Sequence, residues 1–434
     1  MGLFSRKKTK AVVVGLDGVP FTLLQKLIAQ GVLPRLGQIV KTGSFKRMEV
    51  TVPEISAVSW PSFMTGVDPG GHGIFGFTDL VPGSYDATFT NYGSLKAPTI
   101  WDKLEQQGKR SVVINQPGTY PARRLAGALV SGFVAIELHK AVFPAKYIGP
   151  LRRLNYEIDI DTNRARRDHA YALRELESTL EGRQRAVEMF WNVEDWDFFE
   201  VVVTGTDRLH HYLWHALTDE NHELHSRTIN YYRNVDRFVG EMADRYRAET
   251  KDDELSGFFL LSDHGFCGLE KEVALNRYLM EKGLVKFEAD APTDIGQIAS
   301  EAKCFVLDPN RIYVHRRGKY PKGRVEAADA SRVLADVRAA LEDLTFEGRK
   351  LVRRFFTREE AYHGPHAANG PDLVAVSIDG FDFKGAVDRP ETFGHFGLTG
   401  MHNQDGAFLW TAKPCAETPF ITDVAGLILE HLAP

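Results

Sequence analysis

Cysteine is scarce in this chain of 434 residues, which has three widely separated cysteines, Cys267, Cys304 and Cys415. An odd and scattered set excludes a disulfide framework and is typical of reduced thiols inside a cell. The chain also lacks any stretch close to the roughly 18 apolar residues that a membrane-spanning helix needs. Its basic N-terminus is followed by only six apolar residues before Asp17, too few for the core of a signal peptide. We therefore expect a cytoplasmic protein with no membrane span.

An excess of one charge sign is also missing. The formal net charge is −5 at pH 7, with 26% charged and 43% hydrophobic residues, which is an ordinary globular composition. This balance excludes nucleic-acid binding driven by bulk positive charge. The sequence has no internal repeat and no low-complexity segment, so we expect a large folded core. No pattern in the sequence specifies an oligomeric state.

What the chain does contain is a recurring pattern of short apolar runs that end in polar residues. A short apolar run bounded by charge predicts a buried strand. In a parallel sheet the carboxyl ends of the strands meet at one edge, where α/β proteins bind ligands, so we expect the polar residues to surround one crevice. The runs and the residues that follow them are 11–16 with Asp17, 110–114 with Asn115, 198–203 with Asp207, and 257–262 with Asp263 and His264.

Helical segments alternate with these predicted strands. Apolar residues at helical spacing predict helices over about 21–30, 165–191 and 231–246, and a further helix following Asp207. Strand–helix alternation predicts an α/β protein with a mostly parallel central sheet.

The domain organisation follows from a change in the order of predicted elements after His264. Two predicted strands there flank the turn signal of residues 308–310, and a predicted helix and two more strands follow before His402. We predict a smaller α/β insertion, residues 300–395, on a catalytic α/β domain of residues 10–299 and 396–434, with a flexible basic segment at residues 1–9.

Residues 207–211 offer the first set of candidate metal ligands. If a helix begins near Asp207, then Asp207 and His211 lie four residues apart on one face. A carboxylate and an imidazole on one face form half of a zinc-type site. The alternative is that Asp207 caps the helix and the histidines lie on the surface. His210 and His215 are rival ligands that the spacing leaves open.

The second set is Asp263 and His264, which end a predicted strand, together with His402 before the last predicted strand. Gly265 permits a turn that would let both adjacent side chains face one ion, although a buried Asp–His pair is the alternative. A hydroxyl from residues 56–62, activated by a metal, could attack phosphorus. The combined oxygen and nitrogen ligands suffice for two ions, as two-metal phosphoryl chemistry requires: Asp17, Asp207, His211, Asp263, His264 and His402.

The order of these motifs resembles the alkaline phosphatase superfamily, and within it the type I phosphodiesterase/nucleotide pyrophosphatase branch of bacterial phosphohydrolases, with phosphomutases as relatives. Each motif is weak alone, but all five in this order are a strong signal, which spans Val12 to about Ala412. The resemblance implies an alkaline-phosphatase-like three-layer sandwich with a mostly parallel central sheet. The motifs are Asp17-Gly18, Pro53 to Gly66 with His72-Gly73-Ile74, Asp207 to His211, Asp263-His264-Gly265, and Gly400 to Gly406.

The same resemblance implies roles for single residues. The nucleophile of such proteins is a Thr or Ser ten residues before the glycine of a Thr-Gly pair, which here is Ser56, with Ser59 and Ser62 as alternatives. Ser56 would contact one ion and bridge to the other. The remaining ligands would be Asp17, Asp263 and His264 for the first ion, and Asp207, His211 and His402 for the second.

Asn115 is the other catalytic candidate. The asparagine that follows the nucleophile in eukaryotic-type nucleotide pyrophosphatases is absent here, and Asn115 could supply its hydrogen bond. A turn residue before Pro117 is the alternative for Asn115. The loop also departs from two related families: the arginine of the sulfatase motif is replaced by Phe63, and the aspartate of classical alkaline phosphatases by Ile55.

The activity implied is that of a metal-dependent phosphohydrolase, and a phosphodiesterase above all, that acts on a small phosphorylated substrate through a phosphoserine intermediate. Two divalent ions are expected, zinc first and manganese as the alternative. A phosphomutase, a phosphomonoesterase and a non-catalytic member that binds a phosphorylated ligand are the alternative functions.

Overall fold

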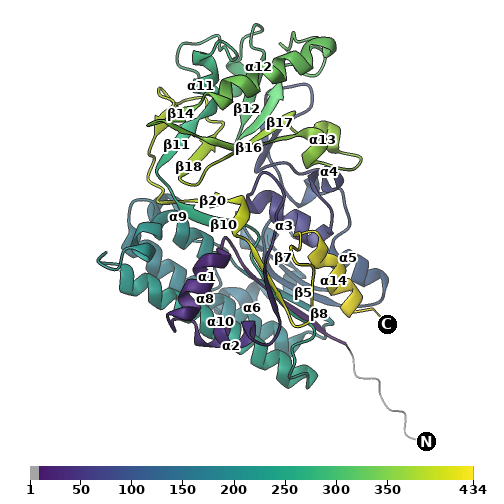
Figure 1. The fold of residues 1–434 in the computed structure, drawn as a ribbon. Helices are drawn as coiled ribbons and strands as arrows, with labels where there is room; N and C mark the ends of the chain where they lie inside the picture. The colour runs from purple at the N-terminus through teal and green to yellow at the C-terminus, as the bar shows by residue number, and fades with distance from the viewer. Residues whose placement is uncertain (1–8, 434) are drawn as a thin grey trace, which may run out of the picture.

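The computed structural model describes residues 9–433, so the predicted basic segment of residues 1–9 lies outside the described residues except for Thr9. An eight-stranded sheet forms the centre (Figure 1). Its five middle strands run parallel, and the three remaining strands pair antiparallel at its two edges. The order is β2 (Ser44–Arg47), β21 (Phe408–Thr411), β9 (Phe258–Leu261), β1 (Ala11–Leu16), β8 (Phe198–Val203), β5 (Ser111–Gln116), β6 (Gly127–Ser131) and β7 (Val142–Phe143).

Strand β1 shows why the apolar runs are continuous and not alternating. Every residue of β1 is buried, because helices cover both faces of a parallel sheet. Val12, Val14 and Leu16 point into the core on one face, and Ala11 and Val13 point into the core on the other.

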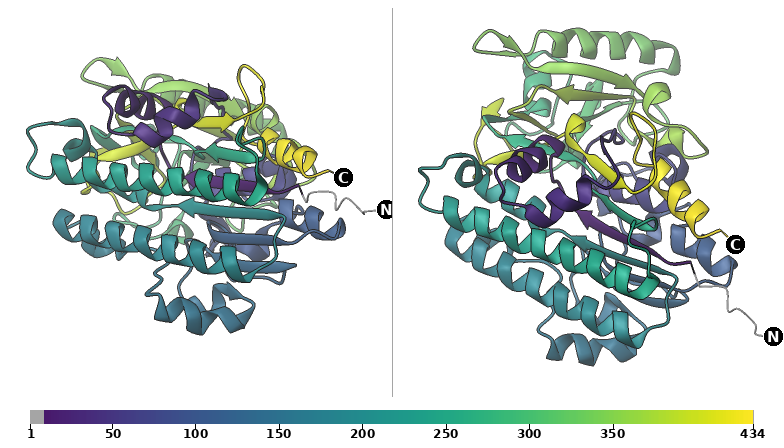
Figure 2. Two further views of the ribbon diagram at one scale, coloured as in Figure 1. Left: turned by 90° about the horizontal axis from the view of Figure 1, so that it is seen from below. Right: turned by 60° about the horizontal axis from the view of Figure 1, so that its bottom comes forward.

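Helices form the two outer layers of this sandwich. The long helices α8 (His169–Val193) and α10 (His225–Thr250) lie side by side against one face, as Figure 2 shows. Helix α10 includes all of the predicted residues 231–246, whereas α8 begins at His169, after the predicted start at about residue 165. The same layer holds α1 (Phe21–Ala29), α2 (Pro34–Val40), α6 (Ile148–Arg153), α7 (Thr162–Ala165) and α9 (Gly205–Thr218). The other layer holds α3 (Ser56–Thr65), α5 (Ile100–Gln106) and α14 (Asp423–His431). Within the described residues, no helix combines the length and apolar character that crossing a bilayer demands.

A smaller α/β part stands above the carboxyl edge of the central sheet, drawn in green at the top of Figure 1. Its own hydrophobic core contains residues from Val273 to Phe383, so side chains of residues 273–298 pack together with those of the predicted insertion. The division at residues 300 and 395 stays a prediction. The main elements are β11 (Lys271–Ala274), α11 (Leu275–Glu281), β12 (Cys304–Leu307), β13 (Arg311–Val314), α12 (Ala330–Glu342), β16 (Val352–Thr357), β17 (Leu373–Ser377) and β18 (Phe381–Lys384).

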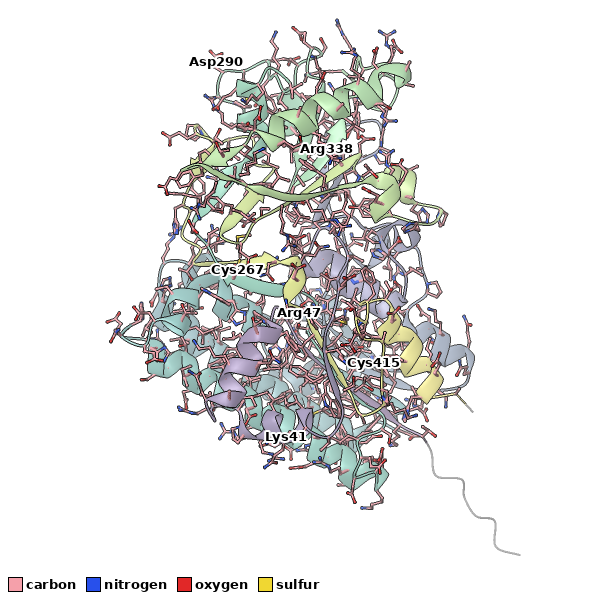
Figure 3. The ribbon with its side chains drawn as sticks, in the orientation of Figure 1. Lys41, Arg47, Cys267, Asp290, Arg338 and Cys415 are labelled. Atoms are coloured by element: carbon pink, nitrogen blue, oxygen red, sulfur yellow. The ribbon has the colours of Figure 1, made fainter. Side chains whose placement is uncertain are left out.

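Short elements complete the chain. A hairpin of β3 (Thr78–Leu80) and β4 (Ala87–Phe89) reaches toward this smaller part. The three cysteines are free thiols, and Figure 3 places Cys267 at the boundary of the two parts and Cys415 on the larger part. The other short elements are α4 (Pro69–His72), β10 (Gly265–Gly268), β14 (Thr345–Phe346), β15 (Arg349–Lys350), α13 (Arg358–Ala361), β19 (Phe393–Gly394) and β20 (Gly400–Asn403).

Candidate active site

Ser56 is the first residue of helix α3. The sequence favours a loop that feeds a short helix here, and the structure begins the helix at Ser56 itself. Its Oγ donates a hydrogen bond to Asp17 Oδ1 at 3.1 Å and lies 3.1 Å from His264 Nε2. The free N–H groups at a helix N-terminus favour a bound anion. A phosphate group in contact with this hydroxyl would therefore lie in a favourable field.

Trp60 fixes helix α3 against strand β1. Its ring lies directly over Gly15, where a Cβ atom would come within 2.5 Å of Trp60 Cη2. The indole N–H of Trp60 donates to Asp17 Oδ2 at 3.1 Å. One aromatic residue thus sets both the position of the helix and the orientation of the carboxylate beside Ser56.

The first ligand group consists of Asp17, Asp263 and His264, all fully buried. Asp17 follows β1 and the other two follow β9, its parallel neighbour. The backbone N–H of Gly18 donates to Asp263 Oδ1 at 3.0 Å, whereas Asp263 Oδ2 has no hydrogen-bond partner among the described residues. Gly18 has a φ of +65°, and a Cβ there would lie 3.1 Å from His264 Cε1, so glycine is required at this turn.

The second ligand group consists of Asp207 and His211 on α9 and His402 on β20. His402 Nε2 lies 3.1 Å from Asp207 Oδ1 and 3.0 Å from His211 Nε2. Antiparallel pairing of β10 with β20 sets His402 opposite Phe266. The centre of the His402 ring lies 3.9 Å from the centre of the His264 ring. The two ligand groups are therefore adjacent.

In the first group, the pKa values of both carboxyl groups are raised. Burial, reinforced by the charges of Asp263 and Asp207, raises the pKa of Asp17 well above its usual range. Burial likewise raises the pKa of Asp263 to about 8. Both groups thus favour a proton, and a cation bound between them would stabilise the ionised forms in its place.

In the second group, the pKa of the carboxyl group is lowered and not raised. Burial opposes ionisation of Asp207, but the charges and hydrogen bonds of His211, Arg208 and His402 outweigh it and hold the pKa of Asp207 well below its usual range. Burial lowers the pKa of His211 to about 4 and that of His402 to about 3. An ionised carboxylate with two neutral imidazoles is a ligand set that binds a divalent ion.

The ring nitrogens of the histidines also fit metal ligands. His211 Nδ1 lies 3.3 Å from Gly400 O, and His264 Nδ1 lies 3.0 Å from Gly265 O. A hydrogen bond donated from Nδ1 to a carbonyl leaves the Nε2 lone pair free for a metal ion. With an orphaned oxygen on Asp263 and no cysteine among the ligands, the six residues fit two hard or borderline divalent ions.

Arg208 is a residue of this site that the sequence analysis missed. Its guanidinium donates to Asp207 Oδ2 at 2.8 Å and to Asp159 Oδ2 at 2.6 Å. It also lies 4.5 Å from the centre of the Phe133 ring. Arg208 stands inside the predicted motif but is no metal ligand type, and no sequence signal connects it to Asp159.

Of the rival candidates, Ser62 and His210 form hydrogen bonds elsewhere, whereas Ser59 forms none among the described residues. Ser62 Oγ donates to Val58 O at 2.9 Å, and Ser59 Oγ has no hydrogen-bond partner among the described residues. His210 contacts Gly18 O and Tyr232 Oη, at 2.9 and 2.6 Å, and the ring of His215 packs against those of His169 and His222.

Asn115 is a buried residue of β5 whose side chain reaches the neighbouring strand β8. Its Nδ2 donates to Val202 O and to Thr204 Oγ1, both at 3.1 Å, and its Oδ1 accepts from Tyr156 at 3.4 Å. Both amide hydrogens are therefore used within the protein. The role of Asn115 toward a substrate stays a prediction.

A family model described as Type I phosphodiesterase / nucleotide pyrophosphatase matches residues 11–402. Phosphonoacetate hydrolase from Sinorhizobium meliloti 1021, solved with phosphonoacetate, aligns with a TM-score of 0.63 at 16% identity, over 98% of this chain and 96% of that chain. An inactive murine ectonucleotide pyrophosphatase / phosphodiesterase 5, solved with AMP, aligns with a TM-score of 0.55 at 15% identity, over 98% and 95% of the two chains. A search of curated protein sequences gives no match. The structural likeness confirms the predicted alkaline-phosphatase-like α/β fold.

Proposed function

Because the chain belongs to the type I phosphodiesterase / nucleotide pyrophosphatase family, a family of phosphoric ester hydrolases, we propose that it is a metal-dependent phosphodiesterase with Ser56 as its nucleophile. The observation that carries this proposal is the contact of Ser56 Oγ with Asp17 and His264 at the N-terminus of α3. The substrate is a small phosphorylated compound.

Two divalent ions, zinc first and manganese as the alternative, would occupy the two ligand groups. When bound, they would lower the pKa of the serine hydroxyl and stabilise the negative charge of the phosphoryl group and of the leaving oxygen. Asp17, Asp263 and His264 would hold one ion, and Asp207, His211 and His402 the other.

The chain's own groups carry the bond changes. Ser56 Oγ attacks phosphorus, the bond from phosphorus to the leaving alcohol breaks, and a phosphoserine forms that still carries the second ester group of the diester. The proton of the Ser56 hydroxyl, which is directed at Asp17 Oδ1, leaves as the new bond forms and balances the charge of the departing alcohol. Water then hydrolyses the phosphoserine and releases a phosphomonoester. Attack in line with the leaving group is the usual geometry of such transfers.

The charges around the second ligand group favour a diester over a monoester. Arg208 and Lys384 lie near His211 of this group, and both are in ion pairs: Arg208 with Asp207 and Asp159, and Lys384 with Asp382. Neither is free to neutralise the second negative charge of a monoester. A diester, with one negative charge, needs no such partner.

The test is hydrolysis of bis-p-nitrophenyl phosphate and p-nitrophenyl phosphate by the wild type, Ser56→Ala and Ser59→Ala proteins. We expect chelator-sensitive cleavage of the diester by the wild type and by Ser59→Ala. Ser56→Ala should lose it while keeping its bound metal. If Ser56→Ala kept the activity and Ser59→Ala lost it, the assignment of Ser56 as the nucleophile would be wrong. Cleavage of the monoester alone would indicate a phosphatase or a mutase.

A further inference from the structure

A cavity of about 350 Å³ lies between the β3–β4 hairpin and the smaller α/β part. The hairpin contributes residues 79–84 to its wall, and the smaller part contributes Leu307, Tyr313, Lys319 and Tyr320. None of the residues of the two ligand groups lines it. Its volume falls within the range of roughly 300–1,000 Å³ that is usual for small-molecule sites, so the cavity is large enough for a ligand of its own.

Contacts at both ends of the hairpin hold the two walls of the cavity together. Near the base of the hairpin, the Arg311 guanidinium donates to Asp79 Oδ1 at 2.7 Å. At its turn, Tyr85 Oη lies 2.5 Å from His315 Nε2 and accepts from the Lys322 N–H at 3.0 Å. Because both walls are fixed, the cavity is formed before a ligand binds, which reduces the entropic cost of binding.

Two of the side chains that line the cavity carry a charge, Asp79 and Lys319. The carboxylate of Asp79 is paired with Arg311, whose own side chain is fully buried. The charge of Asp79 is therefore balanced within the protein, and the amine of Lys319 decides the net charge that a ligand meets.

The amine of Lys319 has no ion-pair partner in the part of the chain that the structure describes. Its one hydrogen bond is long, 3.4 Å to Ala368 O. The charge of Asp372 also acts on it, but that carboxylate is paired with both Arg316 and Arg358. Burial lowers the pKa of Lys319, because an ammonium ion loses hydration there. An anion in the cavity would supply the missing partner.

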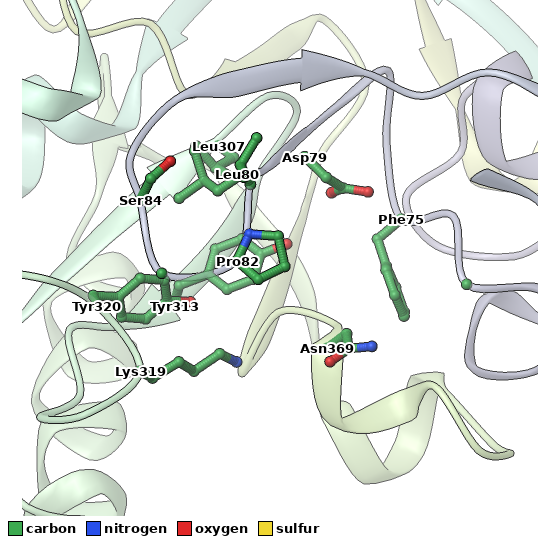
Figure 4. A pocket seen from close by; sticks show the side chains of 13 residues that line it. Phe75, Asp79, Leu80, Pro82, Ser84, Leu307, Tyr313, Lys319, Tyr320 and Asn369 are labelled. Carbon is green, nitrogen blue, oxygen red and sulfur yellow. The ribbon is translucent and has the colours of Figure 1, made fainter. Parts of the chain in front are cut away.

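The rest of the cavity wall is mainly apolar. Leu80, Val81 and Pro82 belong to the hairpin, and Leu307 faces them from the smaller part together with the ring of Tyr320. Figure 4 shows the side chain of Lys319 extended, with its amine directed toward the space that these residues surround. Few polar groups on an apolar wall are typical of sites that orient an apolar ligand by one charged end.

We propose that this cavity binds a small monocarboxylate with an apolar body, such as an aromatic acid. The carboxylate pairs with the amine of Lys319, and the apolar body packs against Leu80, Pro82 and the ring of Tyr320. A cationic ligand would face the charge of Lys319, and an uncharged ligand would leave the ammonium ion unpaired. This site goes beyond the proposed phosphodiesterase function and does not depend on it.

The experiment is calorimetric titration of the protein with four probes that differ in charge or in the ring. Phenylacetate has a ring and a carboxylate, 2-phenylethanol a ring without charge, phenethylamine a ring and a cation, and acetate a carboxylate without a ring. We expect phenylacetate to bind at least about tenfold more tightly than each of the others, because the charged hydrogen bond and the buried ring both contribute. No saturable binding of phenylacetate, or equally tight binding of 2-phenylethanol or phenethylamine, would overturn the proposal.

Variants place the binding in this cavity. Lys319→Met removes the charge from an unbranched side chain and should abolish the preference for phenylacetate over 2-phenylethanol. Lys319→Glu should reverse the preference in favour of phenethylamine. Lys286→Met, which removes an exposed amine paired with Glu301 on the same part, should bind phenylacetate like the wild type, and so should His211→Ala. Unchanged phenylacetate binding in Lys319→Met, or its loss in His211→Ala, would show that the ligand binds elsewhere and would overturn the proposal.

Discussion

Glu200 provides a quantitative test of how the core of the central sheet is built. It lies in the middle of β8, directly opposite Val13 and Val113 of the neighbouring strands. Its side chain points to the same face as Phe198 and Val202 and is fully buried. Neither carboxyl oxygen has a hydrogen-bond partner among the described residues. The surroundings therefore disfavour the charged form of Glu200.

The size of the effect follows from the pKa. Burial raises the pKa of Glu200 from 4.5 to about 8. Between these values the folded state keeps a proton that the unfolded chain releases, so the free energy of unfolding falls as the pH rises. At about 1.4 kcal/mol for each pH unit, the window from 4.5 to about 8 corresponds to about 5 kcal/mol lost by the wild type. Glu200→Gln removes this titration and should be the more stable protein at pH 8.

The assay is urea unfolding of the wild type and of Glu200→Gln at several pH values from 5 to 8. The difference in unfolding free energy between the two should grow in favour of the variant by about 4 kcal/mol across this range. Glu188→Gln, which replaces an exposed carboxylate on α8, should follow the wild type at every pH. A Glu200→Gln difference that does not change between pH 5 and pH 8 would refute the reasoning.

Three further substitutions test the supports of the ligand groups. Gly18→Ala adds a Cβ 3.1 Å from an imidazole carbon of the first group, and we expect loss of metal from that group with a folded protein by circular dichroism. Arg208→Gln removes the guanidinium that helps to hold the pKa of Asp207 low, so on acidification the second group should lose metal at a higher pH than in the wild type, measured by metal content after dialysis. Trp60→Phe removes the 3.1 Å hydrogen bond to Asp17 and should weaken metal binding by about tenfold in a competition titration with a chelator. An unchanged metal affinity of Trp60→Phe would show that the hydrogen bond to Asp17 does not support metal binding.

Much of the fold could be predicted because its signals are local. The runs of residues 11–16 and 198–203 are continuous and apolar, since strands in the middle of a parallel sheet are buried on both faces. The strand ends then place Asp17, Asp207 and Asp263 at one edge. The structure brings the six predicted carboxylate and imidazole ligands together in two adjacent groups, and their roles stay predictions.

The remaining features depend on contacts between distant parts of the chain. The ion pair of Arg208 with Asp159 and the indole bond of Trp60 to Asp17 join residues that no spacing rule connects. The hydrogen bonds of Asn115 to Val202 O and Thr204 Oγ1 likewise could not be predicted from local sequence, and its role toward the substrate stays a prediction.

The most direct test of the central claim is the metal content of the protein after loading with zinc and removal of free ions, measured by plasma mass spectrometry. The two ligand groups predict about two equivalents per chain for the wild type. They also predict about one equivalent each for Asp263→Asn and for His211→Ala, because each variant damages one group. Less than about one equivalent in the wild type, or full content in both variants, would contradict the account.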